Sequence, residues 1–244
     1  MFSLFKSKNT TPVYAGLHTD MHSHLIPGVD DGAPDMETSL GLIRGLAGMG
    51  FKKLITTPHI MWEMYPNTHD DIRSRILELW QRVEEEGIGV EIQAAAEYFL
   101  DGHFKSLLDT KESLLTISGN MVLVEFSMAS PPLDLKEMLF DLQLQGYQPV
   151  IAHPERYVYH ERNKEFFVEL KAAGYLFQLN INSLAGFYGK SSQNLAQYMI
   201  KNDFYDLAGT DLHSFRHLEA LGHPAIAGPL GKLIEQGRLL NKSL

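Results

Sequence analysis

Histidine and acidic side chains stand where apolar, strand-like segments of this chain end. The segment 15–23 closes on His22 and His24, and the last such segment leads into Asp211 and His213. Because residues i and i+2 of a strand point to the same side, each pair can hold one ion. A single His-x-His pattern is a weak signal, since a lone histidine more often packs in a core or on a surface. The recurrence of the pattern raises metal chemistry as a hypothesis.

Four further segments end in the same kind of residue. Their ends are Thr57-Pro58-His59, Ala96-Glu97-Tyr98, Val124-Glu125-Phe126 and Ala152-His153-Pro154-Glu155-Arg156. Six of the seven predicted strands therefore lead to a His, Asp or Glu side chain. Burying ionisable groups among apolar strands is costly unless they are paired or bind a metal. We therefore predict a metal site that holds more than one ion.

The elements that position these residues alternate between strand-like and helical patterns. Short apolar runs predict strands at 15–23, 51–57, 90–97, 120–126, 148–153, 175–181 and 204–210. Apolar residues at helical spacing predict helices at 36–48, 69–86, 133–145, 161–173, 194–202 and 215–238. This alternation is typical of an α/β fold with a parallel sheet.

The distribution of the polar residues favours a closed barrel over an open sheet. A β/α barrel collects catalytic groups from several strand ends, whereas an open sheet concentrates them at one switch point. Because six strand ends contribute here, we predict a seven-stranded β/α barrel. Its single domain would span residues 15–244, after a flexible N-terminal tail at 1–14.

Composition excludes several classes of function. The 244 residues include 11 His and no Cys, which excludes disulfides, Cys-ligated zinc, iron–sulfur clusters and thiolate nucleophiles. A net charge of −9 makes nucleic acid and anionic membrane surfaces poor partners. No segment approaches the ~20 apolar residues of a membrane span, and the apolar run near the N-terminus is too short for a signal peptide. We therefore predict a cytoplasmic protein.

The motifs match a known family in order. The first match is the run HSHLIPGVDDG at 22–32. The later matches are Thr56-Thr57-Pro58-His59, Ala96-Glu97, Val124-Glu125-Phe126-Ser127, Ile151-Ala152-His153-Pro154-Glu155-Arg156-Tyr157 and Asp211-Leu212-His213. Over about residues 18–240 the chain resembles the bacterial capsule and exopolysaccharide tyrosine-protein phosphatases of the polymerase-and-histidinol-phosphatase (PHP) superfamily. The joint order of these short motifs makes the resemblance specific.

The resemblance implies a distorted seven-stranded TIM-like barrel with three divalent metal ions. One metal would be held by His22, His24, Glu97 and Asp211, a second by Glu97, Glu125 and His153, and a third by Asp31, His59 and His213. Arg156 would hold the phosphoryl group, with Asp31 or His213 as candidates for the general acid. Manganese is the first choice of metal, and iron, zinc and cobalt are alternatives.

The activity implied by the resemblance is hydrolysis of protein phosphotyrosine by metal-activated water. The substrate would be the C-terminal tail of a bacterial tyrosine autokinase in capsule or exopolysaccharide synthesis. Glu125 stands where many superfamily members have His, which favours this branch. One alternative is a histidinol-phosphatase-like enzyme for small phosphomonoesters. Another is a metal-dependent nuclease, which the acidic net charge disfavours. A third is a catalytically inactive scaffold protein, which would be expected to lack some of the metal ligands.

Aromatic residues follow three predicted strands near the expected mouth of the site. They are Trp62, Tyr65, Tyr98, Phe99, Phe187 and Tyr188. They could form a wall or lid for a phenyl ring, with the loop 60–68 as the lid, or they could simply pack the loops. The six remaining histidines are predicted outside the chemistry: His18 in packing, and His69, His103, His160, His217 and His223 at the surface.

Overall fold

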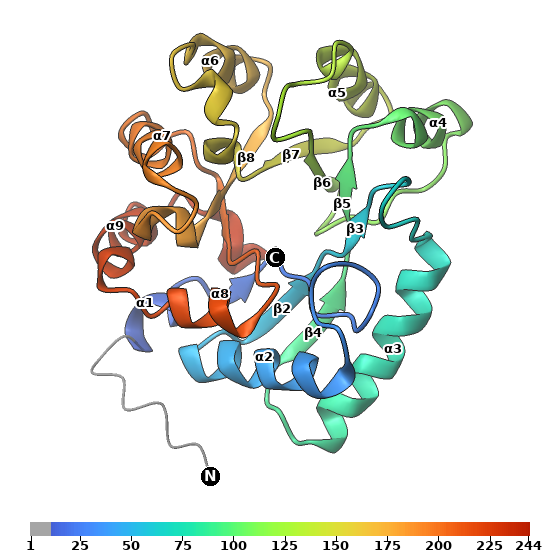
Figure 1. Ribbon diagram of the computed structural model, residues 1–244, viewed down its shortest axis with the longest axis vertical. Coiled ribbons are helices and arrows are strands. Elements are labelled where there is room, and N and C mark those ends of the chain that lie inside the picture. The colour runs from blue at the N-terminus through green and yellow to red at the C-terminus, as the bar shows by residue number, and fades with distance from the viewer. Residues whose placement is uncertain (1–10) are drawn as a thin grey trace.

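The computed structural model describes residues 11–244 and shows helices arranged around short inner strands (Figure 1). The strands are β1 (Thr19–Asp20), β2 (Lys53–Thr56), β3 (His59–Ile60), β4 (Glu91–Ala94), β5 (Glu97–Phe99), β6 (Met121–Glu125), β7 (Gln148–Ala152), β8 (Leu176–Asn180) and β9 (Leu207–Gly209). The α-helices are α1 (Thr11–Ala15), α2 (Met36–Met49), α3 (His69–Glu85), α4 (Gly102–Thr110), α5 (Leu135–Leu144), α6 (Glu165–Ala172), α7 (Lys190–Lys201), α8 (Phe215–Ala220) and α9 (Pro224–Glu235). Short 3-10 helices cover Pro154–Arg156, Val158–His160, Ile181–Ala185 and Leu240–Ser243.

The strands pair in parallel and form two sheets. One sheet has the order β1-β2-β4, and the other has the order β3-β5-β6-β7-β8-β9. Each predicted strand segment contains at least one of these strands. The carboxyl ends of parallel strands meet at one edge, so the polar residues that follow them gather on one side of the molecule.

The predicted α/β class with a curled parallel sheet is confirmed, but a single closed sheet of seven strands is not. The sheet is interrupted around the predicted strands 51–57 and 90–97: β2 lies within 51–57 and is followed by the separate strand β3, and 90–97 contains β4 and only the first residue of β5. Pro58 stands at the first break, and a proline lacks the N–H that a ladder needs. The Glu97 N–H still donates to the Pro58 carbonyl (3.1 Å), so the two segments stay adjacent across the break.

Two apolar clusters fix the strands. The smaller cluster collects residues from most strand segments: Met21, Ile55, Ala95, Ile117, Leu123, Val150, Ala152 and Leu207. The larger cluster joins the strands to the helices that surround them. Because side chains alternate along a strand, one face of the curled sheet packs inward and the other packs on the helices. This packing holds the polar strand ends in place.

Helix α3 illustrates how the sequence builds these helices. The Thr68 side chain accepts from the Asp71 N–H, and the Asp71 carboxylate accepts from the Thr68 N–H, which forms a capping box. Ile72, Leu79 and Val83 are the buried residues, at helical spacing. The helix therefore begins at a defined residue, directly after the loop that follows β3.

The helices differ from the prediction in two places. The predicted helix 215–238 is two helices, α8 and α9, because Gly222 interrupts the pattern and Pro224 starts a new first turn. Helix α4 was not predicted; it begins after Asp101, whose carboxylate accepts from the Phe104 N–H (2.9 Å). None of the described helices has the length and apolarity needed to cross a membrane.

The N-terminal region also differs from the prediction. Residues 11–14, assigned to a flexible tail, lie in α1, where the buried Tyr14 hydroxyl donates to the Leu221 carbonyl. The rest of the predicted tail, residues 1–10, lies outside the described residues. The single domain over 15–244 stays a prediction.

Candidate metal centre

The first and last strands meet through the segments that carry the predicted ligands. Beyond β1 and β9, Ser23 and Leu212 form a parallel bridge. The Asp211 N–H donates to the His22 carbonyl (2.8 Å), and the His24 N–H donates to the Leu212 carbonyl (2.9 Å). This pairing brings the His-x-His segment beside the Asp-x-His segment.

Unusual backbone conformations occur where two predicted ligands follow their strands. His153 after β7 has φ 35°, and Asp211 after β9 has φ 51°. Left-handed backbone is uncommon outside glycine, and such positions tend to occur at functional sites. Close approach also needs Gly209, because a Cβ there would lie 2.6 Å from the His22 Cβ. The strand ends are thus shaped to bring ligands together.

Four donor atoms converge at the floor of the site. His22 Nε2 lies 3.2 Å from both Glu97 Oε2 and Asp211 Oδ1. His24 Nε2 lies 3.4 Å from the same two oxygens and 3.3 Å from His22 Nε2. Ligands about 2.0–2.1 Å from a tetrahedral ion stand about 3.3–3.4 Å from one another. The spacing of this group therefore fits one metal ion.

A second group shares Glu97 with the first. His59 Nδ1 lies 3.0 Å from Glu125 Oε1 and 3.2 Å from Glu97 Oε2, and His153 Nε2 lies 3.1 Å from Glu97 Oε1. His59 Nδ1 and Glu125 Oε1 are both buried, and although they lie 3.0 Å apart their relative orientation makes no hydrogen bond, which leaves both atoms without a partner. Buried polar atoms without a partner are costly, and a cation between these two would satisfy both. The group thus fits a second metal.

A third group lies nearer to solvent. Asp31 Oδ1 is 3.5 Å from His59 Nε2 and 3.4 Å from His213 Nε2, and His24 belongs to the same group. His213 Nδ1 contacts the Asp211 carbonyl (2.9 Å), which leaves Nε2 to face Asp31. His59 therefore directs one ring nitrogen at the second group and the other at the third, whereas the resemblance implied a role in the third alone.

The pKa values of the buried carboxylates and histidines in the cluster depend on one another. Burial by itself raises the pKa values of Glu97 and Asp211, but the adjacent histidines hold both pKa values well below the usual range. Hydrogen bonds from His213 and His59 lower the pKa of Asp31. Burial lowers the pKa of His59, yet the neighbouring carboxylates raise it to about 10. The ionised carboxylates are thus stabilised by nearby positive charge, which either protons on the histidines or divalent ions can supply.

Two supporting residues were not predicted from the sequence. Gln178 Oε1 accepts from His22 Nδ1 (2.9 Å) and from the His153 N–H (3.2 Å). Asp30 Oδ2 accepts from His24 Nδ1 (2.8 Å) and from the His59 N–H (3.1 Å). Such partners fix an imidazole so that its other nitrogen faces the metal. The available signals were a glutamine within the apolar strand 175–181 and the position of Asp30 beside Asp31.

Arg156 stands at the side of the cluster. Its Nη1 donates to Asp211 Oδ2 (2.9 Å), and its guanidinium lies 4.4 Å from the centre of the Tyr188 ring. Asn180 Nδ2 donates to the same Asp211 oxygen (2.8 Å) and to the Tyr188 hydroxyl (3.0 Å). One Asp211 oxygen thus faces the metal group and the other holds Arg156. The remaining guanidinium N–H groups can bind a phosphate.

The cluster forms the floor of a cavity of about 280 Å³, here called the central pocket. Apolar and aromatic side chains line it with the cluster: Met61, Met64, Tyr65, Met128 and Tyr188. His217, predicted at the surface, also lines this pocket. Its Nδ1 accepts from the His213 N–H (3.2 Å), and burial followed by the proximity of His213 lowers its pKa to about 4. A neutral His217 therefore has its ring N–H at Nε2.

The structure brings the predicted site residues together. The nine are His22, His24, Asp31, His59, Glu97, Glu125, His153, Asp211 and His213, and Arg156 joins them through Asp211. Among the other histidines, His18 is exposed rather than packed, and His160 stacks on Phe166 with ring centres 3.7 Å apart. His223 caps α9 at the surface, and His69 and His103 line a second cavity.

The predicted aromatic mouth is present in part. Tyr65 and Tyr188 line the central pocket, whereas Tyr98 is buried in the core. In the predicted lid loop, Met61 and Tyr65 form an antiparallel bridge, and Asn67 Nδ2 donates to the His59 carbonyl (2.8 Å). These bonds tie the loop to the strand that carries a ligand.

Comparison with known proteins places this chain in a family. Residues 18–221 match the model of a family described as capsular polysaccharide synthesis, CpsB/CapC. The tyrosine-protein phosphatase YwqE of Bacillus subtilis is 29% identical over 197 residues, 81% of this chain and 78% of that protein. The tyrosine-protein phosphatase CpsB of Streptococcus pneumoniae is 27% identical over 200 residues, 80% and 82% of the two chains.

Solved structures agree with these sequence matches. A crystal structure from the pair YwqE of Bacillus subtilis and CpsB of Streptococcus pneumoniae, described as unique metal-dependent tyrosine phosphatases, has a TM-score of 0.77 at 27% identity. That match covers 91% of this chain and 94% of the other. The lactonase Lmo2620 of Listeria monocytogenes, with a TM-score of 0.53 at 13% identity over 94% and 88% of the chains, shows the fold alone.

Proposed function

We propose that this chain, which belongs to the CpsB/CapC family of capsular polysaccharide synthesis, is a metal-dependent protein-tyrosine phosphatase. Relatives named YwqE and CpsB are tyrosine-protein phosphatases, which supports this assignment. The observation that carries it is the central pocket, where metal-ligand groups and a guanidinium lie beneath apolar and aromatic side chains. A charged floor below apolar and aromatic walls suits a phosphate group carried on a phenyl ring.

The ligand set supports three divalent metal ions. The donor atoms converge closely enough to bind cations. Bound cations would also satisfy His59 Nδ1 and Glu125 Oε1, which have no hydrogen-bond partner. Imidazole and carboxylate ligands suit manganese, our first choice, as well as iron, zinc or cobalt. With four carboxylates and one hydroxide, three such ions leave the site at about +1, and Arg156 brings it to about +2. That charge complements a phosphate monoester dianion within a chain of net charge −9.

When bound, divalent ions would lower the pKa of a coordinated water so that hydroxide is available at neutral pH. Arg156 would bind the phosphoryl oxygens and stabilise the charge that develops on them. Asp31 and His213 are the candidates for the proton that the leaving phenolate takes up. A phenolate with a pKa near 10 needs less help to leave than a serine alkoxide. With no Cys in the chain and water as the nucleophile, no covalent phosphoenzyme is expected.

We also propose that residues 15–244 act as one catalytic domain built on a distorted seven-stranded barrel. The Ser23–Leu212 bridge, which joins the first strand segment to the last, supports this closure. The proposed substrate is a phosphotyrosine protein, the C-terminal tail of a tyrosine autokinase in capsule or exopolysaccharide synthesis. The capsular polysaccharide family of the chain supports that choice of pathway, and we propose a cytoplasmic location for the reaction.

The test is steady-state hydrolysis of a phosphotyrosine peptide, a phosphoserine peptide and histidinol phosphate by protein of measured metal content. We expect the highest kcat/KM for phosphotyrosine and loss of activity after chelation, with recovery on adding Mn²⁺. Preferred hydrolysis of histidinol phosphate would instead establish the small-molecule alternative. Trapping a covalent phosphoenzyme would contradict the mechanism.

A further inference from the structure

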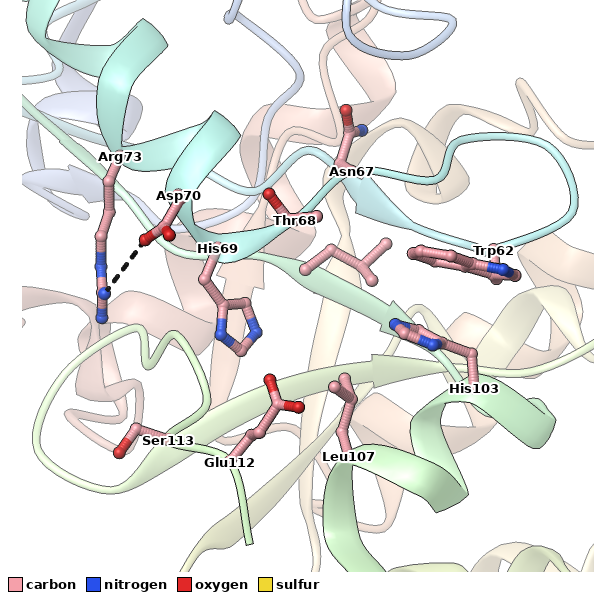
Figure 2. Close-up of a pocket in the computed structure, with 11 residues that line it drawn as sticks. Trp62, Asn67, Thr68, His69, Asp70, Arg73, His103, Leu107, Glu112 and Ser113 are labelled. Carbon is pink, nitrogen blue, oxygen red and sulfur yellow. Dashed lines mark ion pairs between the residues drawn. The ribbon is translucent and has the colours of Figure 1, made fainter. Parts of the chain in front are cut away.

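A second cavity of about 420 Å³ lies beside the loop that follows β3 (Figure 2). Its walls come from the start of α3, from α4 and from the residues after α4: Ile60, Trp62, Asn67, Thr68, His69, Asp70, Arg73, His103, Leu107, Glu112 and Ser113. None of these residues belongs to the metal-ligand groups described above. The proposed catalytic chemistry therefore leaves this cavity unexplained.

The second cavity and the central pocket share one stretch of backbone. His59 and Met61 line the central pocket, whereas Ile60 and Trp62 line the second cavity. Successive Cα atoms are about 3.8 Å apart, so a single strand separates the two spaces. Helix α4 begins just after the carboxyl end of β5, and α3 follows β3 after the loop 61–68, at the edge of the sheet where the central pocket also lies. A peptide held at the central pocket would therefore pass close to the second cavity.

One side of the second cavity is aromatic and apolar. The Trp62 ring stacks on His103 with ring centres 4.1 Å apart, and Figure 2 shows the two rings together at one end of the cavity. Trp62 is 47% exposed, although Ile60 beside it is buried. A partly exposed tryptophan is the best aromatic partner for a cation.

The middle of the cavity holds a neutral histidine. The Tyr98 hydroxyl accepts from the Leu115 N–H (2.7 Å), so its own hydrogen is free to donate to His69 Nε2 (2.8 Å). Burial lowers the pKa of His69, which agrees with this neutral form. His69 therefore adds no positive charge to the cavity at neutral pH.

The remaining charges are acidic overall. Figure 2 shows the Glu112 carboxylate directed toward His69 and the middle of the cavity. Within the described chain, no basic side chain forms an ion pair with Glu112, whose hydrogen-bond partner is the Thr110 hydroxyl at 3.5 Å. Asp70 and Arg73 offset each other at 3.9 Å. The cavity thus presents one carboxylate without an ion-pair partner toward its middle and a pair of stacked aromatic rings at one end.

We propose that the second cavity binds a basic side chain, arginine or lysine, of the phosphotyrosine protein substrate. The cation would lie against Trp62 and pair with Glu112. Because adjacent residues of one strand line the two cavities, the basic residue would stand a few positions from the phosphotyrosine. This assignment rests on the proposed function and names a feature of its substrate.

The test compares three phosphotyrosine peptides that carry arginine, alanine or glutamate at the second to fourth positions on both sides of the phosphotyrosine. We expect kcat/KM for the arginine peptide to exceed that for the alanine peptide by about 3- to 10-fold, as expected for a partly exposed cation–π and ion-pair contact. In Glu112→Gln this ratio should fall toward one. Glu84→Gln is the matched control, because it removes an equal charge from α3 outside both cavities.

The outcomes separate this inference from the proposed function. A control is needed because the negative net charge of the chain alone also attracts basic peptides. Glu84→Gln lowers that net charge as much as Glu112→Gln does, and it should keep the wild-type ratio. An equal fall of the ratio in both variants, or an unchanged ratio in Glu112→Gln, would overturn the inference. So would a preference for the glutamate peptide. Absence of hydrolysis of every phosphotyrosine substrate, free phosphotyrosine included, would overturn the proposed function and this inference with it.

Discussion

Glu155 and Glu97 are both fully buried, but their surroundings differ. Glu155 Oε1 accepts from the Asn180 N–H (2.9 Å) and the Ser183 hydroxyl (2.7 Å), and its Oε2 accepts from the Tyr205 hydroxyl (2.9 Å). Both oxygens are satisfied by the chain itself. Burial nevertheless raises the pKa of Glu155, because three neutral donors do not replace full hydration.

The surroundings of Glu97 are charged and incompletely paired. Its neighbours include His22, His59 and His153, and the adjacent Glu125 Oε1 has no hydrogen-bond partner. The chain supplies hydrogen-bond donors to both oxygens of Glu155, but around Glu97 it leaves polar atoms without partners. Burial of a carboxylate alone therefore does not mark a functional site, whereas the convergence of several charged donors with unsatisfied atoms does.

The largest expected effect separates these two carboxylates directly. In Glu97→Gln we expect kcat/KM for phosphotyrosine to fall by about 1,000-fold or more, because a lost ligand should exceed the 10- to 100-fold cost of a lost supporting residue. Glu155→Gln should lose far less activity but destabilise the fold by about 1–3 kcal/mol, since a buried acceptor becomes a donor. Kinetics and denaturant unfolding of both variants measure the contrast, and the reverse pattern would contradict it.

The next effect concerns a residue that touches the cluster without belonging to it. In Gln178→Leu, His22 Nδ1 and the His153 N–H lose their common acceptor. We expect metal affinity and kcat/KM to fall by about 10- to 100-fold. Gln143→Leu, on α5 outside the central pocket, is the control. Titration with Mn²⁺ gives the affinity, and wild-type affinity in Gln178→Leu would remove its positioning role.

Metal removal should distinguish the two regions by stability. A metal at about 100 times its Kd adds about 2.7 kcal/mol, which corresponds to about 5–10 °C in Tm for a chain of this size. We expect chelation to lower the Tm of the wild type by that amount and of Glu155→Gln by the same amount. Glu97→Gln should respond much less. Calorimetry with and without chelator measures this, and an unchanged wild-type Tm would count against bound metal.

A smaller effect is expected at His69, a half-buried residue whose Nε2 accepts from the Tyr98 hydroxyl in the neutral form. Its folded pKa lies below the ordinary 6.5, so the unfolded chain takes up more protons as pH falls through that value. The stability that His69 contributes is therefore present above pH 6.5 and is lost below it. Between about pH 7.5 and about pH 5.5, the wild type should lose more stability than His69→Gln. Equal losses in urea unfolding would show that His69 is not buried in its neutral form.

The residues that converge in the candidate metal centre could be singled out from the sequence because their signal is local. A pair such as His22 and His24 needs only strand periodicity to indicate a common direction. Gln178 could not be predicted in this way, because it contacts His22, 156 residues away. His217 lies only four residues from His213, but it stands on the helix α8, where strand periodicity gives no signal. The closed barrel was inferred from the positions of the polar residues. That pattern carries no information about the interruption between β2 and β3 at Pro58.

The bridge between Ser23 and Leu212 has a consequence for biosynthesis. It joins the two ends of the ligand set, and the nearby bonds from Thr210 to Asp20 span 190 residues. A ribosome releases the first histidines long before Asp211 emerges, so the early ligands must wait for the last strand. A contact between such distant segments also forms slowly, because the intervening chain has to be ordered first. The candidate metal centre therefore cannot be assembled before the segment that carries Asp211 and His213 has been made.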